Sequence, residues 1–160
     1  MAKLRDNALV EDLILACTGA GVSSKTAQKA IRAVCRYYGG QMIYVPVKKE
    51  TGKSAENLRG ILADAVGDSA AEKCLSKIMS LYGNMQLYIP LERMAFRTTI
   101  ALEIYERYGK DECSMNDLAR QYGISFTLAY GLWKIGQHEK LKPSMPYLPF
   151  LELAENNNSD

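Results

Sequence analysis

The stretch that decides the fold is Tyr82–Pro90, YGNMQLYIP, because the chain contains a similar stretch earlier, YGGQMIYVP at Tyr38–Pro46. The offset is 44 residues, from Tyr38 to Tyr82, and it holds upstream as well. There it places apolar residues opposite apolar residues: Ala27, Ile31, Val34 and Cys35 opposite Ala71, Leu75, Ile78 and Met79. It also places Ser24 opposite Asp68, and both residue types are good helix N-caps. Each copy therefore predicts a capped amphipathic helix, a glycine exit and a short strand that ends at proline.

A repeated unit of this kind usually means that one copy completes the core of the other. A further helix is predicted before each copy, at about 9–17 and from Ser54 onwards, and the pattern after Pro90 is purely helical. We therefore predict a mainly α fold: a duplicated helix-helix-strand module with a two-stranded antiparallel ribbon, followed by a three-helix helix-turn-helix domain. The predicted parts are the first module with its linker, the second module, the helix-turn-helix domain and a Pro-rich, disordered tail, at residues 1–53, 54–91, 92–142 and 143–160.

The ribbon has two possible inward faces. Tyr44 and Tyr88 occupy equivalent positions and should lie on the face away from the aliphatic residues of the two strands. We expect the aliphatic face, formed by Ile43, Val45, Leu87 and Ile89, to pack on the helices and the tyrosines to be partly exposed.

Composition argues against several classes of protein. The four cysteines lie far apart without a C-x-x-C pair, which predicts reduced thiols in a cytoplasmic protein. The lone His138 has no neighbouring ligand, so we expect a surface residue, no metal and no cofactor. No phosphate loop, nucleophile–histidine pair or carboxylate cluster predicts an enzyme. No segment approaches the ~20 apolar residues that span a bilayer, so we expect no membrane association.

Positive charge is concentrated in the first third of the chain. Residues 1–53 carry nine Lys/Arg against four Asp/Glu, whereas residues 91–160 carry eight against ten. Lys25, Lys29, Arg32 and Arg36 form the face of the predicted helix 25–38 that lies opposite its apolar stripe. This basic face is either simply solvated or a patch that faces DNA phosphates.

Residues 115–134 fit a helix-turn-helix. Ala119 supplies the small residue where the two helices cross, and Gly123 supplies a turn residue that tolerates positive φ. Ser114 with Asp117 resembles a capping box, and Ser125 caps the last helix, to about residue 140. A small three-helix core without a DNA role has the same spacing, so the pattern alone leaves both readings open.

Two segments, QLYIP at Gln86–Pro90 and LARQYGISF at Leu118–Phe126, make the chain resemble the Mor/C family of phage (Mu-like) transcription activators. The resemblance implies a dimer in which the Y-I-P strands form the interface, and a helix-turn-helix that reads a dyad site near a promoter. The implied interface residues are Ile43, Tyr44, Val45, Leu87, Tyr88 and Ile89. The implied DNA-binding residues are Ser125, Thr127, Leu128, Gly131 and Lys134, to which we add Lys140 and the basic residues Lys25, Lys29, Arg32 and Arg36.

The chain departs from that family pattern in two ways. Residues 9–47 look like a second dimerisation module, which predicts a monomeric pseudo-dimer, or a swapped homodimer that uses the same strands. The expected DNA-reading face carries Lys134 as its one cation before Lys140. Two functions therefore stay open: a phage or prophage DNA-binding regulator that acts on double-stranded DNA, with RNA polymerase as a possible host partner, or a phage-encoded inhibitor that binds a host protein such as a defence factor.

Overall fold

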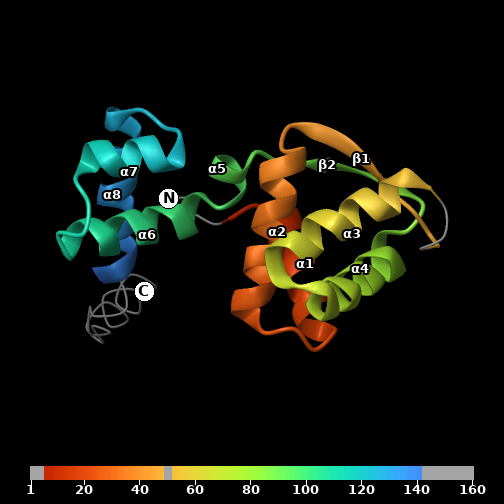
Figure 1. Ribbon diagram of the computed structural model, residues 1–160. Helices are drawn as coiled ribbons and strands as arrows, with labels where there is room; N and C mark the ends of the chain where they lie inside the picture. The colour runs from red at the N-terminus through yellow and green to blue at the C-terminus, as the bar shows by residue number, and fades with distance from the viewer. Residues whose placement is uncertain (1–5, 49–51, 142–160) are drawn as a thin grey trace, which may run out of the picture. The chain divides into compact units, whose positions relative to one another are not determined.

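The computed structural model describes residues 6–48 and 52–141 (Figure 1). The predicted disordered tail, residues 143–160, lies outside the described residues. The chain divides into two compact units, Met1–Thr99 and Ile100–Asp160. The first unit contains four long helices, two strands and one short helix: α1 (Ala8–Gly19), α2 (Ser24–Tyr38), β1 (Gln41–Val45), α3 (Lys53–Val66), α4 (Asp68–Tyr82), β2 (Met85–Ile89) and α5 (Glu92–Ala95).

The two halves of the first unit correspond residue by residue. Helices α2 and α4 both contain 15 residues, and their bounds differ by the 44-residue offset of the sequence repeat. The five buried residues of α2 all have a buried counterpart in α4 at that offset: Ala27, Ala30, Ile31, Val34 and Cys35 match Ala71, Cys74, Leu75, Ile78 and Met79. Helix α1 packs against α4 and α2 packs against α3, so each half buries its apolar face on the other.

Strands β1 and β2 pair antiparallel within the chain, as predicted, and lie against α2, α3 and α4 (Figure 1). Leu87 is 8% exposed and Val45 and Ile89 are buried, whereas Tyr44 and Tyr88 are 47% and 57% exposed. The predicted inward face of the ribbon is therefore confirmed for three of its four residues, while Ile43 is only partly buried. Alternation of side chains along a strand explains the result, because residues two apart share one face. The mainly α fold with a small antiparallel ribbon is also confirmed.

Several predicted helix boundaries are wrong by a residue or more. Ser23, rather than Ser24, caps α2, because its Oγ accepts a hydrogen bond from the backbone N–H of Thr26 at 3.2 Å. Glycines with positive φ precede α3 and α4, so Ser54 and Asp68 lie inside these helices and are not caps.

The helical pattern predicted after Pro90 begins with two helices. Phe96, with φ −111° and ψ 34°, separates α5 from α6 (Arg97–Gly109). This break fits the burial of the Phe96 ring, which is fully buried. No glycine or proline marks the position, so the sequence pattern did not reveal it.

The second unit contains the greater part of α6, α7 (Met115–Tyr122) and α8 (Phe126–Leu141). Its core is formed by residues from all three helices: Ile100, Ala101, Ile104, Met115, Leu118, Ala119, Ala129 and Leu132. Gly136 of α8 lies directly on α6, and a Cβ atom at this position would clash with the carbonyl oxygen of Ala101. The absence of a side chain therefore allows the two backbones to approach.

Candidate nucleic-acid interface

Helices α7 and α8 and the turn between them have the local geometry of a helix-turn-helix. Ser114 Oγ accepts a hydrogen bond from the backbone N–H of Asp117 at 3.2 Å and donates to its carboxylate at 2.7 Å, which confirms the predicted cap. Gly123 has φ 63° and ψ 37°, the left-handed conformation predicted for the turn. The backbone N–H of Ile124 donates to Ala119 at 2.9 Å, and this bond closes the end of α7.

The start of α8 is fixed by Ser125. Its Oγ accepts a hydrogen bond from the backbone N–H of Leu128 at 3.1 Å, and its carbonyl oxygen accepts one from Ala129 at 2.9 Å. The N–H groups of the first helical residues, Phe126 and Thr127, have no preceding turn to donate to. They are available to an anion at this helix end, where the helix dipole also favours negative charge.

A polar cluster holds α7 on α6. The hydroxyl of Tyr122 donates to the carboxylate of Glu103 at 2.7 Å. Burial and this hydrogen bond raise the pKa of Tyr122 to about 12, so the phenol keeps its proton near neutral pH. The guanidinium of Arg107 donates to the sulfur of Cys113 at 3.3 Å. These contacts fix the orientation of α7, and of the turn that follows it, relative to α6.

Most of the residues predicted to read DNA lie at the surface of α8. Ser125, Thr127, Leu128 and Lys134 are exposed and Gly131 is partly exposed. Ala129, Leu132 and Gly136 form the buried side of the helix. With 3.6 residues per turn, Thr127, Gly131 and Lys134 fall opposite that side. Lys140 lies near the other end of α8, where its ammonium group pairs with Glu106 at 2.8 Å.

Sequence reasoning missed an aromatic row along one flank of α8. Phe126 stacks on Tyr130 with ring centroids 6.5 Å apart, and Tyr130 lies 5.4 Å from Trp133. Trp133 in turn contacts Tyr108 of α6 edge to face at 5.7 Å. Lys134 Nζ lies 5.0 Å from the centre of the Tyr130 ring. The spacing of residues 126, 130 and 133 is the signal that could have revealed this row.

The four basic residues of α2 do not share one environment. Lys25 and Lys29 are exposed. Arg32 and Arg36 both donate to the carboxylate of Glu92, at 3.1 and 3.0 Å, and the Arg32 guanidinium also lies 5.6 Å from the centre of the Phe96 ring. Burial alone would raise the pKa of Glu92, but the hydrogen bonds and charges of the two arginines outweigh it and hold that pKa below its usual range. The two arginines therefore tie α5 to α2.

The cysteines are free thiols, and three of them fill the core of the first unit. Cys17 and Cys74 hydrogen-bond to each other between α1 and α4, and this bond, together with burial, raises the pKa of the Cys17 thiol. Burial also raises the pKa of Cys35 to about 12. Among residues 6–48 and 52–141, no three His, Cys, Asp or Glu side chains are grouped as metal ligands would be.

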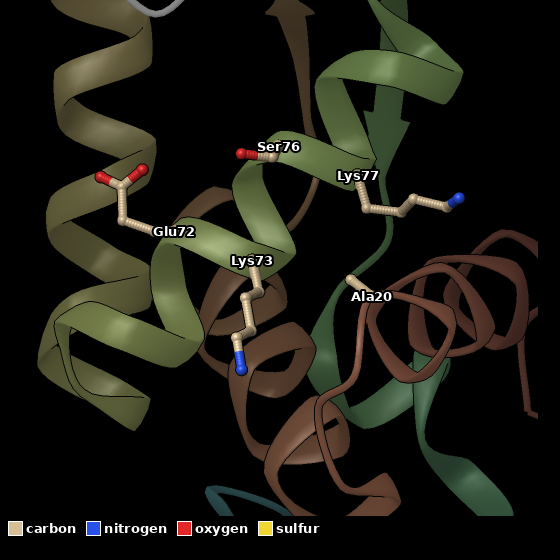
Figure 2. Close-up of a pocket in the computed structure, with 5 residues that line it drawn as sticks. All are labelled: Ala20, Glu72, Lys73, Ser76 and Lys77. Carbon is tan, nitrogen blue, oxygen red and sulfur yellow. The ribbon is translucent and has the colours of Figure 1, made fainter.

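A surface hollow of about 380 Å³ lies between α4 and the turn after α1. Figure 2 shows that its polar side chains leave α4 in different directions: Glu72 and Ser76 toward one side, Lys77 toward the other. Glu72 pairs with Arg59 of α3. The side chains do not converge on a common point, so this hollow has no arrangement that suggests catalysis. No helix within the described parts of the chain is long and apolar enough to cross a membrane.

Comparison with known proteins gave one finding. The model of the Mor transcription activator family matches residues 48–144, which include α3, α4, β2 and the whole of α6 to α8. No curated protein and no solved structure gave a match.

Proposed function

The chain belongs to the Mor transcription activator family, and on that premise we propose that it is a phage or prophage regulator that binds DNA through α7 and α8. Family membership by itself assigns the chain to transcription regulation and DNA binding. The proposal adds the element that reads the DNA and the residues that do so. The observation that carries it is the capped helix-turn-helix, which leaves Ser125, Thr127 and Lys134 at the surface of α8.

Placing α8 in a major groove gives its surface residues distinct roles. The amides of Phe126 and Thr127 and the hydroxyl of Ser125 suit a phosphate at the groove edge. Thr127 and Lys134 are the polar side chains opposite the buried side of α8, so they are the residues that we assign to base edges. Leu128 adds an apolar contact. Gly131 has no side chain and therefore lets the helix backbone approach the DNA closely. Small polar and apolar groups can distinguish the thymine methyl group from a hydrogen-bonding edge.

Phosphate contacts must come from cations near this surface or elsewhere on the chain. Arg120 of α7 is exposed, and it is a candidate that sequence reasoning did not name. Lys25 and Lys29 are exposed on α2 and remain candidates. Arg32, Arg36 and Lys140 already pair with carboxylates, so DNA would have to compete with Glu92 or Glu106 for them. We therefore expect Lys25 and Lys29 to contribute more than the two arginines.

The remaining parts of the proposal concern assembly and setting. The pairing of β1 with β2 inside one chain favours a monomeric pseudo-dimer over a swapped homodimer that uses the same strands. A transcription activator in the cytoplasm meets RNA polymerase, which is the host partner that this function requires. We assign the chain no catalytic activity, since the family is one of transcription regulators.

The test is a fluorescence-anisotropy titration of duplex DNA from the upstream region of the chain's own gene, at several salt concentrations. Each phosphate contact that is lost should flatten the slope of log affinity against log salt by about one unit. Lys29→Ala should do so, while Lys73→Ala should not. Lys73 is the matched control, because it occupies the position of Lys29 at the 44-residue offset and is also exposed. Thr127→Ala should relax sequence preference without changing the slope.

Failure of DNA binding would contradict the proposal. If the titration shows no salt-dependent binding tighter than about 10 µM even at low salt, the chain binds DNA more weakly than many non-specific binders do. A slope that Lys29→Ala leaves unchanged would remove α2 from the interface and leave the assignment of α8 to be judged by Thr127→Ala alone.

A second function is favoured by one observation, the exposed apolar groups at the start of α8. Phe126 is 51% exposed and stacks with Tyr130 on one flank of α8, while Leu128 is exposed on the other flank. Aromatic residues anchor protein–protein interfaces, so this surface would suit an inhibitor that binds a host protein, for example a defence factor. In that case Leu128→Glu should abolish partner binding, whereas Lys29→Ala and Lys134→Ala should have little effect. Leu128 is a cleaner probe than Trp133, whose ring packs on Tyr108.

A further inference from the structure

The first unit covers its own apolar faces with residues of one copy of the chain. We infer that one copy of the chain binds a single, non-palindromic DNA half-site. This inference rests on the proposed function. It concerns the N-terminal module, residues 8–91, and its relation to the helix-turn-helix. Four observations carry it: the register of the ribbon, the reciprocal contacts at its two ends, the packing of the helices, and the connection from each strand to the next helix.

If each residue of the ribbon is replaced by its counterpart at the 44-residue offset, the same set of strand pairs results. Gln41 pairs with Ile89 and Val45 with Met85, while the central pair is Ile43 and Leu87. Leu87 is the counterpart of Ile43, and Ile89 and Met85 are the counterparts of Val45 and Gln41. The ribbon therefore has a local twofold axis at its central pair, and both of its strands come from one chain.

The two ends of the ribbon repeat the same contacts. The backbone N–H of Gly40 donates to Ile89 at 2.7 Å, and that of its counterpart Asn84 donates to Val45 at 2.8 Å. Both residues have positive φ, 81° for Gly40 and 66° for Asn84. The backbone of Leu91 covers Gly39 in the same way that the backbone of Val47 covers Gly83. Each half thus supplies the residue that covers the turn of the other half.

The helices complete this closure. Helix α1 packs against α4 and α2 packs against α3, so the apolar faces of the first half are buried by the second. The aliphatic face of the ribbon is buried as well, through Val45, Leu87 and Ile89. A second copy of the chain is not needed to cover any of these surfaces, which supports a module that is complete in one copy.

The local twofold axis does not extend to the DNA-reading helices. After β2 the chain continues into α5, α6 and the helix-turn-helix of α7 and α8. After β1 it passes directly into α3, with residues 46–52 as the whole connection. Within the described residues, the reading element is therefore attached to one half of the module only. Palindromic operators mirror a twofold axis that relates two reading helices. Residues 6–48 and 52–141 supply one such helix and no second reading element for a mirrored half-site.

The experiment selects the DNA and then divides the selected site. The full chain selects duplexes from a library with about 30 random base pairs, or three helical turns. Titrations then use the selected duplex, a duplex with either flank of the consensus scrambled, and a duplex that contains the consensus as an inverted repeat. Sedimentation of the free chain and of the complex gives the number of copies, with 17.8 kDa expected for one copy of the chain.

We expect an asymmetric consensus, one chain on each selected duplex and a Hill coefficient of one. Scrambling the flank should change affinity less than about threefold, and the inverted repeat should bind two chains independently. A reader of two half-sites would behave differently, because each mismatched base pair lowers affinity by roughly 5- to 150-fold. An inverted-repeat consensus bound by two chains would overturn the inference while leaving the proposed function intact. No enriched sequence at all would overturn the proposed function and the inference together.

Discussion

Gly136 provides the sharpest test of how α8 is held. A Cβ atom added there would clash with the carbonyl oxygen of Ala101 and would stand 2.7 Å from Cβ of Tyr105. Both obstacles are backbone or near-backbone atoms, so no side-chain rotation relieves them. Helix α8 must move away from α6 by about 1 Å, and a gap of that size forfeits a quarter to a half of each van der Waals contact that it opens.

The magnitude follows from two opposing effects. Overpacking of a core typically costs about 1–3 kcal/mol, and at the closest backbone approach we take the upper part of that range or more. Alanine gains up to about 1 kcal/mol over glycine from helix propensity. Gly136→Ala should therefore lower the free energy of unfolding by about 1–3 kcal/mol. Gly131→Ala is the matched control in the same helix, because a Cβ there meets nothing within 4 Å. It should raise the free energy of unfolding by about 0.5–1 kcal/mol.

The assay is thermal unfolding followed by the fluorescence of Trp133, which is the single tryptophan of the chain and lies on α8. For a unit of this size 1 kcal/mol shifts Tm by about 4–8 °C, so the two variants should differ by on the order of 10 °C. A Gly136→Ala variant that melts at or above the wild-type temperature would refute the close approach of α6 and α8. Equal shifts in the two variants would refute it as well.

Two further predictions concern the first unit. Leu87→Ala should cost about 2–4 kcal/mol of unfolding free energy and Tyr88→Ala under about 1.5, because the first side chain is buried and the second exposed; urea midpoints in the reverse order would contradict the orientation of the ribbon. Glu92→Gln should destabilise the protein at neutral pH, because the charged form of Glu92 is the one that pairs with Arg32 and Arg36. Since the pKa of Glu92 is lowered from 4.5, its contribution to the free energy of unfolding is present above that value and is lost as the pH falls below it. If the difference in unfolding free energy between wild type and variant persisted unchanged to low pH, it would contradict the ion pair.

The repeat made much of the first unit predictable. The offset between Tyr38–Pro46 and Tyr82–Pro90 was enough to predict the antiparallel ribbon, because two short strands with apolar faces need a partner. The inward face followed from the chemistry of Ile43, Val45, Leu87 and Ile89. Cap residues were less certain. Ser23 and Ser24 are neighbours with the same side chain, so propensity alone could not decide which one accepts the bond from Thr26.

The sequence pattern could not predict contacts between residues that are far apart in the sequence. Glu92 neutralises Arg32 and Arg36 because the chain returns to α2 after β2, and no local signal predicts such a return. The close approach at Gly136 was equally unpredictable. From the sequence alone, a glycine in a helix interior indicates only a lower helix propensity, because its neighbour on the other helix is not known. The aromatic row of Phe126, Tyr130 and Trp133 has a visible helical spacing, but spacing alone does not show whether such a row is buried or exposed.

The most direct test of the central claim, that α7 and α8 bind DNA, is amide hydrogen exchange of the full chain with and without the selected duplex. The first amides of α8, at Phe126 and Thr127, lack partners in a preceding turn and should exchange quickly in the free chain. We predict that the duplex slows exchange at residues 124–128. Unchanged exchange there, with the duplex bound and other segments protected, would contradict the assignment of α8 as the reading helix.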